Sequence, residues 1–240
     1  MRIIVNGACG RMGREVTRIA SEGGHEIAGL VDVCEGVPGV VNDISLCGNA
    51  DVIIDFSHHT CIGAVLEAAN ARRCAAIICT TGHTPEELDM IARAATDIPV
   101  FHSGNMSVGV ALLCRLAAQT ARMFPEADVE IVEIHHKHKK DAPSGTAKML
   151  FNAVKDVRPE AEMVCGRSGM QPRTPGEVGV SSLRMGEIVG IHEVHVSTGT
   201  QTITLKHEAH SRTLFAEGAM CAAGFMAGKA PGLYDMNAMI

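Results

Sequence analysis

A basic segment at residues 135–140 is the part of the sequence best suited to acid–base chemistry. All six of its residues are His or Lys. An imidazole titrates near neutral pH, and a lysine among cationic neighbours becomes a better acid, so the segment can accept and donate protons. Ser144 then resembles a helix N-cap, and the free N–H groups of such a helix start attract a carboxylate. Together these features predict a site for a small acidic substrate.

The basic segment at residues 135–140 has alternative interpretations. His135, His136 and His138 could bind a metal, but Asp141 is the only carboxylate close by, no cysteine is near, and the lysines repel a cation. We therefore expect no metal. A solvated basic loop is what composition alone favours. A serine nucleophile has no support because G-x-S-x-G is absent, and the phosphate-binding pattern G-x-x-x-x-G-K-[ST] is absent as well.

A glycine-rich turn, N-G-A-C-G-R-M-G at residues 6–13, follows the first apolar run. Glycines let a backbone turn tightly and approach a pyrophosphate, which the positive end of the next helix attracts. The spacing departs from G-x-G-x-x-G, and a turn that needs glycine only for packing is the alternative. Asp32, however, ends the second predicted strand, where a carboxylate accepts hydrogen bonds from the adenosine ribose. The combination predicts a dinucleotide site.

Asp32 also bears on which dinucleotide binds. A carboxylate beside the ribose repels a 2′-phosphate, so NADH is the favoured cofactor. Val33 supplies no cation, but Arg11 or Arg14 could supply one from the glycine turn. Use of NADPH therefore stays open.

The first hundred residues alternate short β-branched runs with longer Ala-rich ones. Strands are predicted at 2–5, 26–31, 52–55, 76–79 and 99–101, with helices at 11–21, 61–71, 85–95 and 108–123. This succession predicts a Rossmann-like, doubly wound parallel α/β sheet with right-handed crossovers. Residues after the third, fourth and fifth strands would then lie along the edge where the nicotinamide sits.

After about Phe124 the pattern changes. A strand is predicted at 128–135, a helix at 144–154, and strands at 180–184, 188–196 and 202–207, whereas 158–179 is rich in Gly, Pro, Arg and Ser. Strands without intervening helices predict a second, α+β domain with an antiparallel or mixed sheet. A helix at 213–227 could return to the first domain. We expect a dinucleotide-binding domain of residues 1–107 and 213–240, and a substrate-binding domain of residues 108–212.

Composition excludes several classes of protein. The formal charge of −6, with no Trp and one Tyr, argues against a nucleic-acid binder or a membrane-surface protein. Nine cysteines without C-x-x-C spacing fit neither a disulfide framework nor a zinc ribbon, so we expect free thiols in a reducing cytoplasm. The first apolar run is too short for a signal peptide, and no run approaches the length of a membrane span. We expect a soluble, cytoplasmic enzyme with a small-molecule substrate.

Residues 130–147, E-I-V-E-I-H-H-K-H-K-K-D-A-P-S-G-T-A, resemble the signature of the 4-hydroxy-tetrahydrodipicolinate reductase (dihydrodipicolinate reductase) family, E-[IV]-x-E-x-H-x-x-x-K-x-D-x-P-S-G-T-A, at every fixed position. The resemblance extends to segments 7–13, 80–82, 105–109, 184–192 and 232–236. It implies NAD(P)H-dependent reduction of 4-hydroxy-tetrahydrodipicolinate to tetrahydrodipicolinate in diaminopimelate and lysine biosynthesis. It also implies a homotetramer formed through the sheets of the central domain.

The resemblance assigns roles by position in the motif. His135 would be a proton donor or acceptor and Lys139 the second proton donor. The substrate would contact His136, Ser144, Gly145 and Thr146. The cofactor would contact the glycine turn, the residue after the second strand and the later strand ends, at Gly7, Ala8, Cys9, Gly10, Arg11, Met12, Gly13, Asp32, Phe56, Cys79, Thr80, Thr81, Gly104, Asn105 and Met106.

Three features depart from the family pattern. The segment between Asp32 and Asp51 is short, Cys79 stands where the family often has glycine, and Met106 stands where the family often has Phe.

Two other functions are alternatives to this reductase. A related oxidoreductase, such as an aspartate dehydrogenase, conflicts with the intact segment 135–147. A nicotinamide-sensing regulator without catalytic activity conflicts with the retention of His135 and Lys139. Such a regulator would also need a module that binds nucleic acid or a partner, and the sequence shows no helix-turn-helix candidate outside the two predicted domains.

Overall fold

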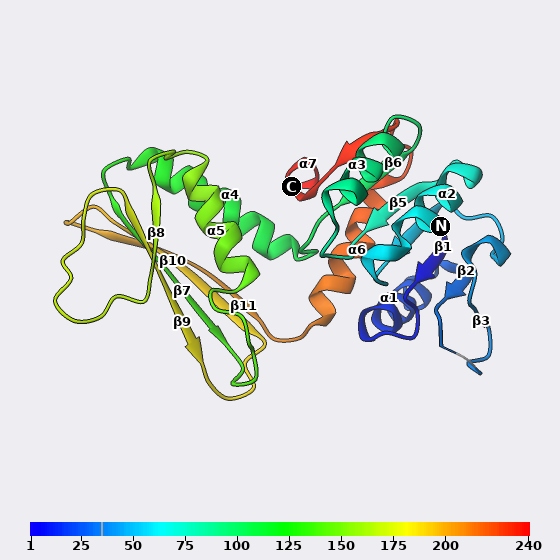
Figure 1. Ribbon diagram of the computed structural model, residues 1–240, viewed down its shortest axis with the longest axis horizontal. Coiled ribbons are helices and arrows are strands. Elements are labelled where there is room, and N and C mark those ends of the chain that lie inside the picture. The colour runs from blue at the N-terminus through cyan, green and yellow to red at the C-terminus, as the bar shows by residue number, and fades with distance from the viewer. Residues whose placement is uncertain (35) are drawn as a thin grey trace. The chain divides into compact units, whose positions relative to one another are not determined.

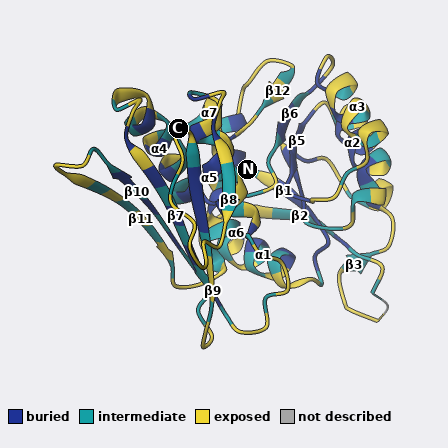
Figure 2. Cartoon of the chain, turned by 60° about the vertical axis from the view of Figure 1, so that its left-hand side comes forward, coloured by how far each residue is buried: buried dark blue, intermediate teal, exposed yellow. Residues whose placement is uncertain are grey.

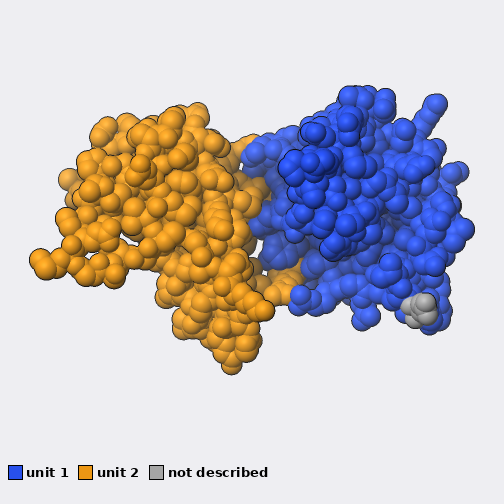
Figure 3. Space-filling view, viewed as in Figure 1, with its two compact units in different colours: residues 1–107, 213–240 blue, residues 108–212 orange. Residues whose placement is uncertain are grey.

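The computed structural model describes residues 1–34 and 36–240. The chain divides into two compact units, shown in different colours in Figure 3. Unit 1 comprises Met1–Ser107 and Thr213–Ile240, and unit 2 comprises Val108–Arg212.

Unit 1 contains a seven-stranded parallel sheet in the order β12-β6-β5-β4-β1-β2-β3 (Figure 1). Because β1 pairs with β2 on one side and β4 on the other, the strand order reverses at β1, which confirms the Rossmann-like prediction. The strands are β1 (Arg2–Asn6), β2 (Glu26–Val31), β3 (Val40–Val41), β4 (Val52–Asp55), β5 (Ala75–Ile78), β6 (Pro99–His102) and β12 (Gly232–Tyr234).

Helices cover this sheet on both faces, so all residues of β4 and β5 are buried (Figure 2). One face packs Ile53 and Ile78 against Ile62 and Ile91 in two adjacent helices. A capping box of Thr84 and Glu87 starts the second of these helices, which the sequence predicted at residues 85–95. The helices of unit 1 are α1 (Arg11–Glu22), α2 (Ile62–Arg72), α3 (Pro85–Ala94), α6 (Thr213–Met226) and α7 (Met236–Met239).

Unit 2 contains a five-stranded sheet in the order β11-β10-β7-β9-β8. The central strand β7 is antiparallel to β10 and parallel to β9, so the predicted mixed sheet is confirmed. Two helices, α4 (Val108–Met123) and α5 (Gly145–Lys155), contribute Leu113, Ala117 and Leu150 to its core. The strands are β7 (Asp128–His135), β8 (Glu162–Cys165), β9 (Glu177–Arg184), β10 (Gly190–Ser197) and β11 (Thr202–Ala209).

Strand β7 alternates strictly between buried and less buried residues. Val129 and Ile131 belong to the apolar core on the helix-covered face. Since alternate residues of a strand share a face, Glu133 and His135 continue the same buried row. The strand thus carries two polar side chains into a buried layer, where a carboxylate needs partners.

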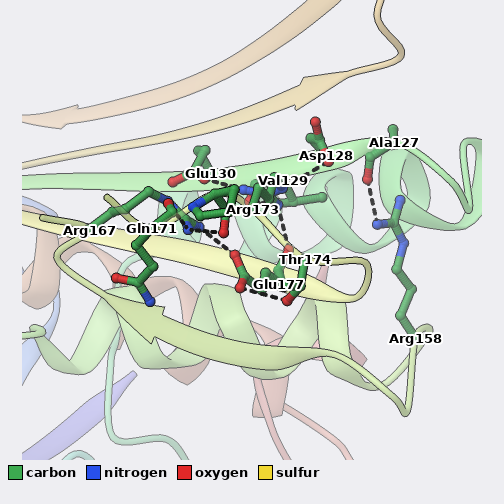
Figure 4. A network of polar contacts seen from close by, with 11 residues as sticks. Ala127, Asp128, Val129, Glu130, Arg158, Arg167, Gln171, Arg173, Thr174 and Glu177 are labelled. Atoms are coloured by element: carbon green, nitrogen blue, oxygen red, sulfur yellow. Dashed lines mark hydrogen bonds and ion pairs between the residues drawn. The ribbon is translucent and has the colours of Figure 1, made fainter. Parts of the chain in front are cut away.

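The stretch 158–179 differs from its prediction because it contains β8 and the first residues of β9. A buried arginine anchors its start: Arg158 donates hydrogen bonds to the carbonyl oxygens of Ala121, Phe124 and Ala127. Farther on, Arg173 pairs with Asp128 and Glu130 of β7, as Figure 4 shows. Side chains that reach back to earlier elements therefore order a segment whose local composition is typical of a loop.

The expectation that all cysteines are free thiols is wrong for one pair. Cys9 and Cys34 form a disulfide although 25 residues separate them in sequence. The parallel pairing of β1 with β2 explains this proximity, because Cys9 and Cys34 follow the carboxyl ends of these neighbouring strands. The other seven cysteines are free.

Candidate active site

The glycine turn connects β1 to α1, where the sequence predicted a pyrophosphate cradle. Gly7 has a φ of +79°, and a Cβ there would lie 2.6 Å from the carbonyl oxygen of Phe56. A Cβ on Gly13 would lie 2.1 Å from the carbonyl oxygen of Gly7. Neither position admits a larger residue, so these glycines bring the turn against the neighbouring strand end and close to its own helix.

Asp32 follows β2 and faces the same turn. Its Oδ2 accepts a hydrogen bond of 2.8 Å from the backbone N–H of Cys9. A cavity of about 840 Å³ is lined by Gly7, Gly10, Asp32 and Phe56 among other residues. Four of the predicted cofactor residues thus line one cavity of a size suited to a ligand.

A buried carboxylate ties together the strand ends at this cavity. Asp55 is fully buried at the end of β4. It accepts hydrogen bonds from Asn6 Nδ2 (2.8 Å), Ser57 Oγ (2.6 Å) and Thr80 Oγ1 (2.7 Å), which follow or end three different strands. Asp55 was not among the predicted site residues, although a polar residue that ends a buried strand is a signal of function.

The remaining predicted cofactor residues differ in exposure. Thr81 and Gly104 are exposed in loops after β5 and β6. Cys79 and Met106 are buried, with 7% and 2% of their surfaces exposed, and burial raises the pKa of the Cys79 thiol well above its ordinary value. Cys79 and Met106 therefore offer a cofactor little accessible surface. Ala8, Gly13 and Thr80 are buried, Cys9, Met12 and Asn105 are half-buried, and Arg11 is exposed.

In unit 2, Glu133 is the centre of a polar cluster. It has no exposed surface, and its two carboxylate oxygens accept hydrogen bonds of 2.8 Å each from the guanidinium of Arg184. Ser144 N–H donates to Oε1 at 3.1 Å, and His135 Nδ1 lies 2.5 Å from Oε2. Burial raises the pKa of Glu133, but hydrogen bonds from Arg184, Ser182 and His135 outweigh this and lower it to about 2. Glu133 is therefore ionised at neutral pH.

The ionised carboxylate fixes the tautomer of His135. A carboxylate only accepts, so Nδ1 carries the proton and Nε2 is left as a proton acceptor. Burial lowers the pKa of His135 below its ordinary 6.5, and this effect outweighs the opposing hydrogen bond from Glu133. His135 is thus a neutral, oriented base at neutral pH.

Lys139 has different surroundings from those predicted. Its Nζ lies 2.9 Å from Asp141 Oδ1, and its side chain is 21% exposed. Besides the predicted cationic neighbours, Lys139 has an acidic one, because the turn after β7 folds back and brings Asp141 against the ammonium. Hydrogen bonding to Lys139 in turn lowers the pKa of Asp141. His136 is half-buried in the same turn.

The start of α5 lies beside this cluster through Ser144. Its hydroxyl accepts the N–H of Ala147 at 3.2 Å and contacts His192 Nε2 at 3.1 Å, and the residue is only 2% exposed. These two contacts hold the Ser144 hydroxyl at the start of the helix, and its predicted contact with the substrate stays a prediction. Gly145 is exposed and Thr146 is half-buried at the first turn of the helix, where backbone N–H groups point outward.

Three residues of the cluster received no role from the sequence: Glu133, Arg184 and His192. Burial lowers the pKa of His192 to about 4, and its ring lies 5.1 Å from that of His135. Alternation along β7 places Glu133 on the face of His135 and could have identified it. Arg184 lies opposite His135 in the register of β7 and β9, and no local sequence pattern reveals that register.

Two protein-family models match successive parts of the chain. "Dihydrodipicolinate reductase, N-terminus" matches residues 1–106, and "Dihydrodipicolinate reductase, C-terminus" matches residues 109–240. The chain belongs to the dihydrodipicolinate reductase family. Among curated members, the 4-hydroxy-tetrahydrodipicolinate reductase of Caldanaerobacter subterraneus is 40% identical, with 100% of this chain and 98% of that protein covered. The one from Alkaliphilus oremlandii is 37% identical with the same coverage.

Solved structures agree in fold. Dipicolinate-bound dihydrodipicolinate reductase from Paenisporosarcina sp. TG-14 matches with a TM-score of 0.85 and 22% identity, covering 99% of this chain and 98% of that one. Aspartate dehydrogenase from Thermotoga maritima gives a TM-score of 0.54 at 14% identity, covering 96% of this chain and 98% of that one. Membership of the dihydrodipicolinate reductase family makes the chain an oxidoreductase, and the solved structures show the fold that it shares with them. No helix among the described residues is long and apolar enough to cross a bilayer.

Proposed function

We propose that the chain catalyses the NADH-dependent reduction of 4-hydroxy-tetrahydrodipicolinate to tetrahydrodipicolinate in diaminopimelate and lysine biosynthesis. The main support for the proposal is that a buried, ionised Glu133 orients His135. Lys139 and the start of α5 follow shortly afterwards in the sequence. Curated relatives that match the whole chain bear the name of this reductase.

Unit 1 is proposed to hold the dinucleotide. The turn from Gly7 to Gly13 is proposed to let a pyrophosphate approach the N-terminus of α1, and Gly7 permits the tight turn because a Cβ there would collide with the backbone of Phe56. Asp32 is proposed to accept hydrogen bonds from the adenosine ribose, and the loops with Thr81 and Gly104 to border the nicotinamide. The bound nicotinamide supplies a hydride.

Unit 2 is proposed to hold the dicarboxylate substrate. Backbone N–H groups of Gly145 and Thr146 suit one carboxylate, and His136 suits a contact to the ring or the second carboxylate. Ser144 is better described as a positioning residue, because its hydroxyl holds the helix start and His192. The related Paenisporosarcina reductase binds dipicolinate, a planar dicarboxylate of this kind.

The reaction consumes a hydride and a proton and releases the 4-hydroxyl as water. Lys139, an ammonium held by Asp141, is proposed as the proton donor. The free Nε2 of His135 is proposed to accept the ring proton that is lost with the 4-hydroxyl and to return it to the ring after hydride transfer, so that the proton from Lys139, which leaves in the water, is the one consumed. Removal of either side chain should therefore lower turnover more than substrate affinity.

NADH is the proposed cofactor over NADPH. Asp32 lines the cavity with its carboxylate, and Val33 beside it is 85% exposed and uncharged. A 2′-phosphate at that position would be repelled by Asp32 and would find no cation at residue 33.

We further propose a cytoplasmic homotetramer assembled through the sheet of unit 2. The helices α4 and α5 cover one face of this sheet. Val132 and Ile134 belong to the opposite face of β7, and Leu183, paired with Ile134 on β9, is 40% exposed. An uncovered face with apolar side chains suits a second copy of the chain. Light scattering during size-exclusion chromatography should give four times the chain mass of 25.3 kDa.

The test of the activity is an assay with freshly generated 4-hydroxy-tetrahydrodipicolinate and either NADH or NADPH. We expect turnover with a higher kcat/KM for NADH, and no comparable turnover of L-aspartate with NAD⁺. Oxidation of aspartate at a higher kcat/KM, with no reduction of the heterocycle, would identify a different oxidoreductase.

A further inference from the structure

Two cysteine sulfurs and a carboxylate meet at the ribose end of the dinucleotide site. Cys9 lies in the glycine turn and Cys34 two residues after Asp32, with their Cα atoms 6.8 Å apart. The two Sγ atoms and a carboxylate oxygen of Asp32 all lie within 4.8 Å of one another. In the described part of the chain, no other three His, Cys, Asp or Glu residues bring ligand atoms so close together.

We propose that the reduced Cys9–Cys34 pair and Asp32 form a binding site for a thiophilic divalent cation of the Zn²⁺ class. Two thiolates and one carboxylate are three protein ligands of the types that tetrahedral zinc accepts, and water can fill the fourth position. The hard cations Ca²⁺ and Mg²⁺ prefer oxygen ligands and would be poor occupants.

The structure has the pair as a disulfide, which cannot bind the cation. A dithiol reductant transfers two electrons and two protons to the disulfide, yields two cysteine thiols and is itself oxidised to a disulfide. Cation binding then displaces one proton from each thiol, so two protons are released for each ion bound. The site therefore exists only in the reduced protein.

Backbone hydrogen bonds hold the carboxylate between the two cysteines. The N–H of Cys9 donates to Oδ2 of Asp32 at 2.8 Å, and the N–H of Cys34 donates to Oδ1 at 3.3 Å. Each carboxylate oxygen has a further lone pair, so these bonds orient Asp32 without exhausting its capacity. All three residues are half-buried, which permits entry of an ion while excluding much of the solvent.

Occupation of this site should oppose cofactor binding, and here the inference rests on the proposed function. Asp32 is the residue proposed to accept the ribose hydroxyls, and a carboxylate that ligates a cation has fewer lone pairs for them. Cation and NADH are therefore expected to compete. By linkage, each should weaken the binding of the other by the same factor, about 5-fold or more.

The experiment titrates the reduced full-length protein with Zn²⁺ against a chromophoric chelator, and with Co²⁺ to observe thiolate-to-cobalt charge-transfer absorption. We expect one high-affinity ion per chain, release of two protons, and loss of the site after oxidation with diamide. The substitutions Cys9→Ser, Cys34→Ser and Asp32→Asn should each weaken binding at least about 10-fold. Cys221→Ser, which removes an exposed thiol of the same unit, should leave the site unchanged.

Failure of the inference and failure of the proposed function give different results. Absence of stoichiometric Zn²⁺ binding, or binding that survives Cys34→Ser, would overturn the cation site. Where NADH binds the metal-free protein, Zn²⁺ binding that is lost in Cys34→Ser but indifferent to saturating NADH would overturn the competition between cation and cofactor. NADH binding to the metal-free protein is measured separately by fluorescence. If NADH does not bind, the proposed function fails, while the Cys34→Ser and Asp32→Asn titrations still decide the cation site.

Discussion

Among single residues, Lys139 is the proposed proton donor, and it is not expected to bind the dinucleotide. Replacing Lys139 with Ala should lower kcat by about 10²–10⁴-fold, the usual contribution of a positioned acid. The NADH dissociation constant should stay unchanged, because Lys139 belongs to unit 2. Lys140→Ala, which removes an exposed neighbouring ammonium, serves as the matched control. Equal losses of turnover and NADH affinity in Lys139→Ala would contradict this role.

Asp32 makes a second residue-scale prediction, about cofactor choice. Replacing it with Ser removes the charge that repels a 2′-phosphate, so the ratio of kcat/KM for NADPH to that for NADH should rise about 10-fold or more. Steady-state kinetics with both cofactors measures the ratio. Asp43→Ser, at another carboxylate of the same cavity, is the control. An unchanged ratio in Asp32→Ser would remove Asp32 from the ribose site.

The lowered pKa of Glu133 predicts how the free energy of unfolding depends on pH. Its pKa is about 2 in the folded chain against an ordinary 4.5, so the unfolded chain binds the proton more readily. Its ionised form therefore adds stability above about pH 4.5, and this is lost as pH falls toward about 2. In urea unfolding from pH 6 to pH 3, the wild type should lose more stability than Glu133→Gln.

At the element scale, Asp55 joins the ends of β1, β4 and β5 through three side-chain donors. Asp55→Ala would remove the buried carboxylate that all three donors share, so the free energy of unfolding should fall by about 3 kcal/mol. Asp51→Ala removes an ion pair with Arg2 in which both side chains are 45% exposed, and should cost less than about 1 kcal/mol. Chemical denaturation of both variants gives the comparison, and similar losses would contradict the proposed role of Asp55.

Elements with strong local signals could be predicted from the sequence. The glycine turn before α1, the capping box of α3 and the alternation of β7 each follow from a few neighbouring residues. Strands β3, β8 and β12 were missed because they are two to four residues long and owe their existence to neighbouring strands. The Glu133–Arg184 pair and the Cys9–Cys34 bridge were missed for a related reason, since strand register brings their members together.

At the scale of the whole molecule, the proposed cofactor residues belong to unit 1 and the proposed catalytic residues to unit 2. The chain leaves unit 1 after Ser107 and returns to it at Thr213, so both chain ends belong to the same unit. Each unit has its own apolar core, which lets each site be built on rigid strands and helix starts. The reaction nevertheless needs both sites, because a hydride passes directly from cofactor to substrate.

That transfer can be measured with NADH carrying deuterium at both C4 positions. The reaction of freshly generated 4-hydroxy-tetrahydrodipicolinate with this cofactor should yield tetrahydrodipicolinate with one deuterium per molecule, as determined by mass spectrometry. Lys139→Ala should give the same labelled product more slowly. Product that contains no deuterium, or oxidation of NADH without any reduced heterocycle, would contradict the proposed reaction.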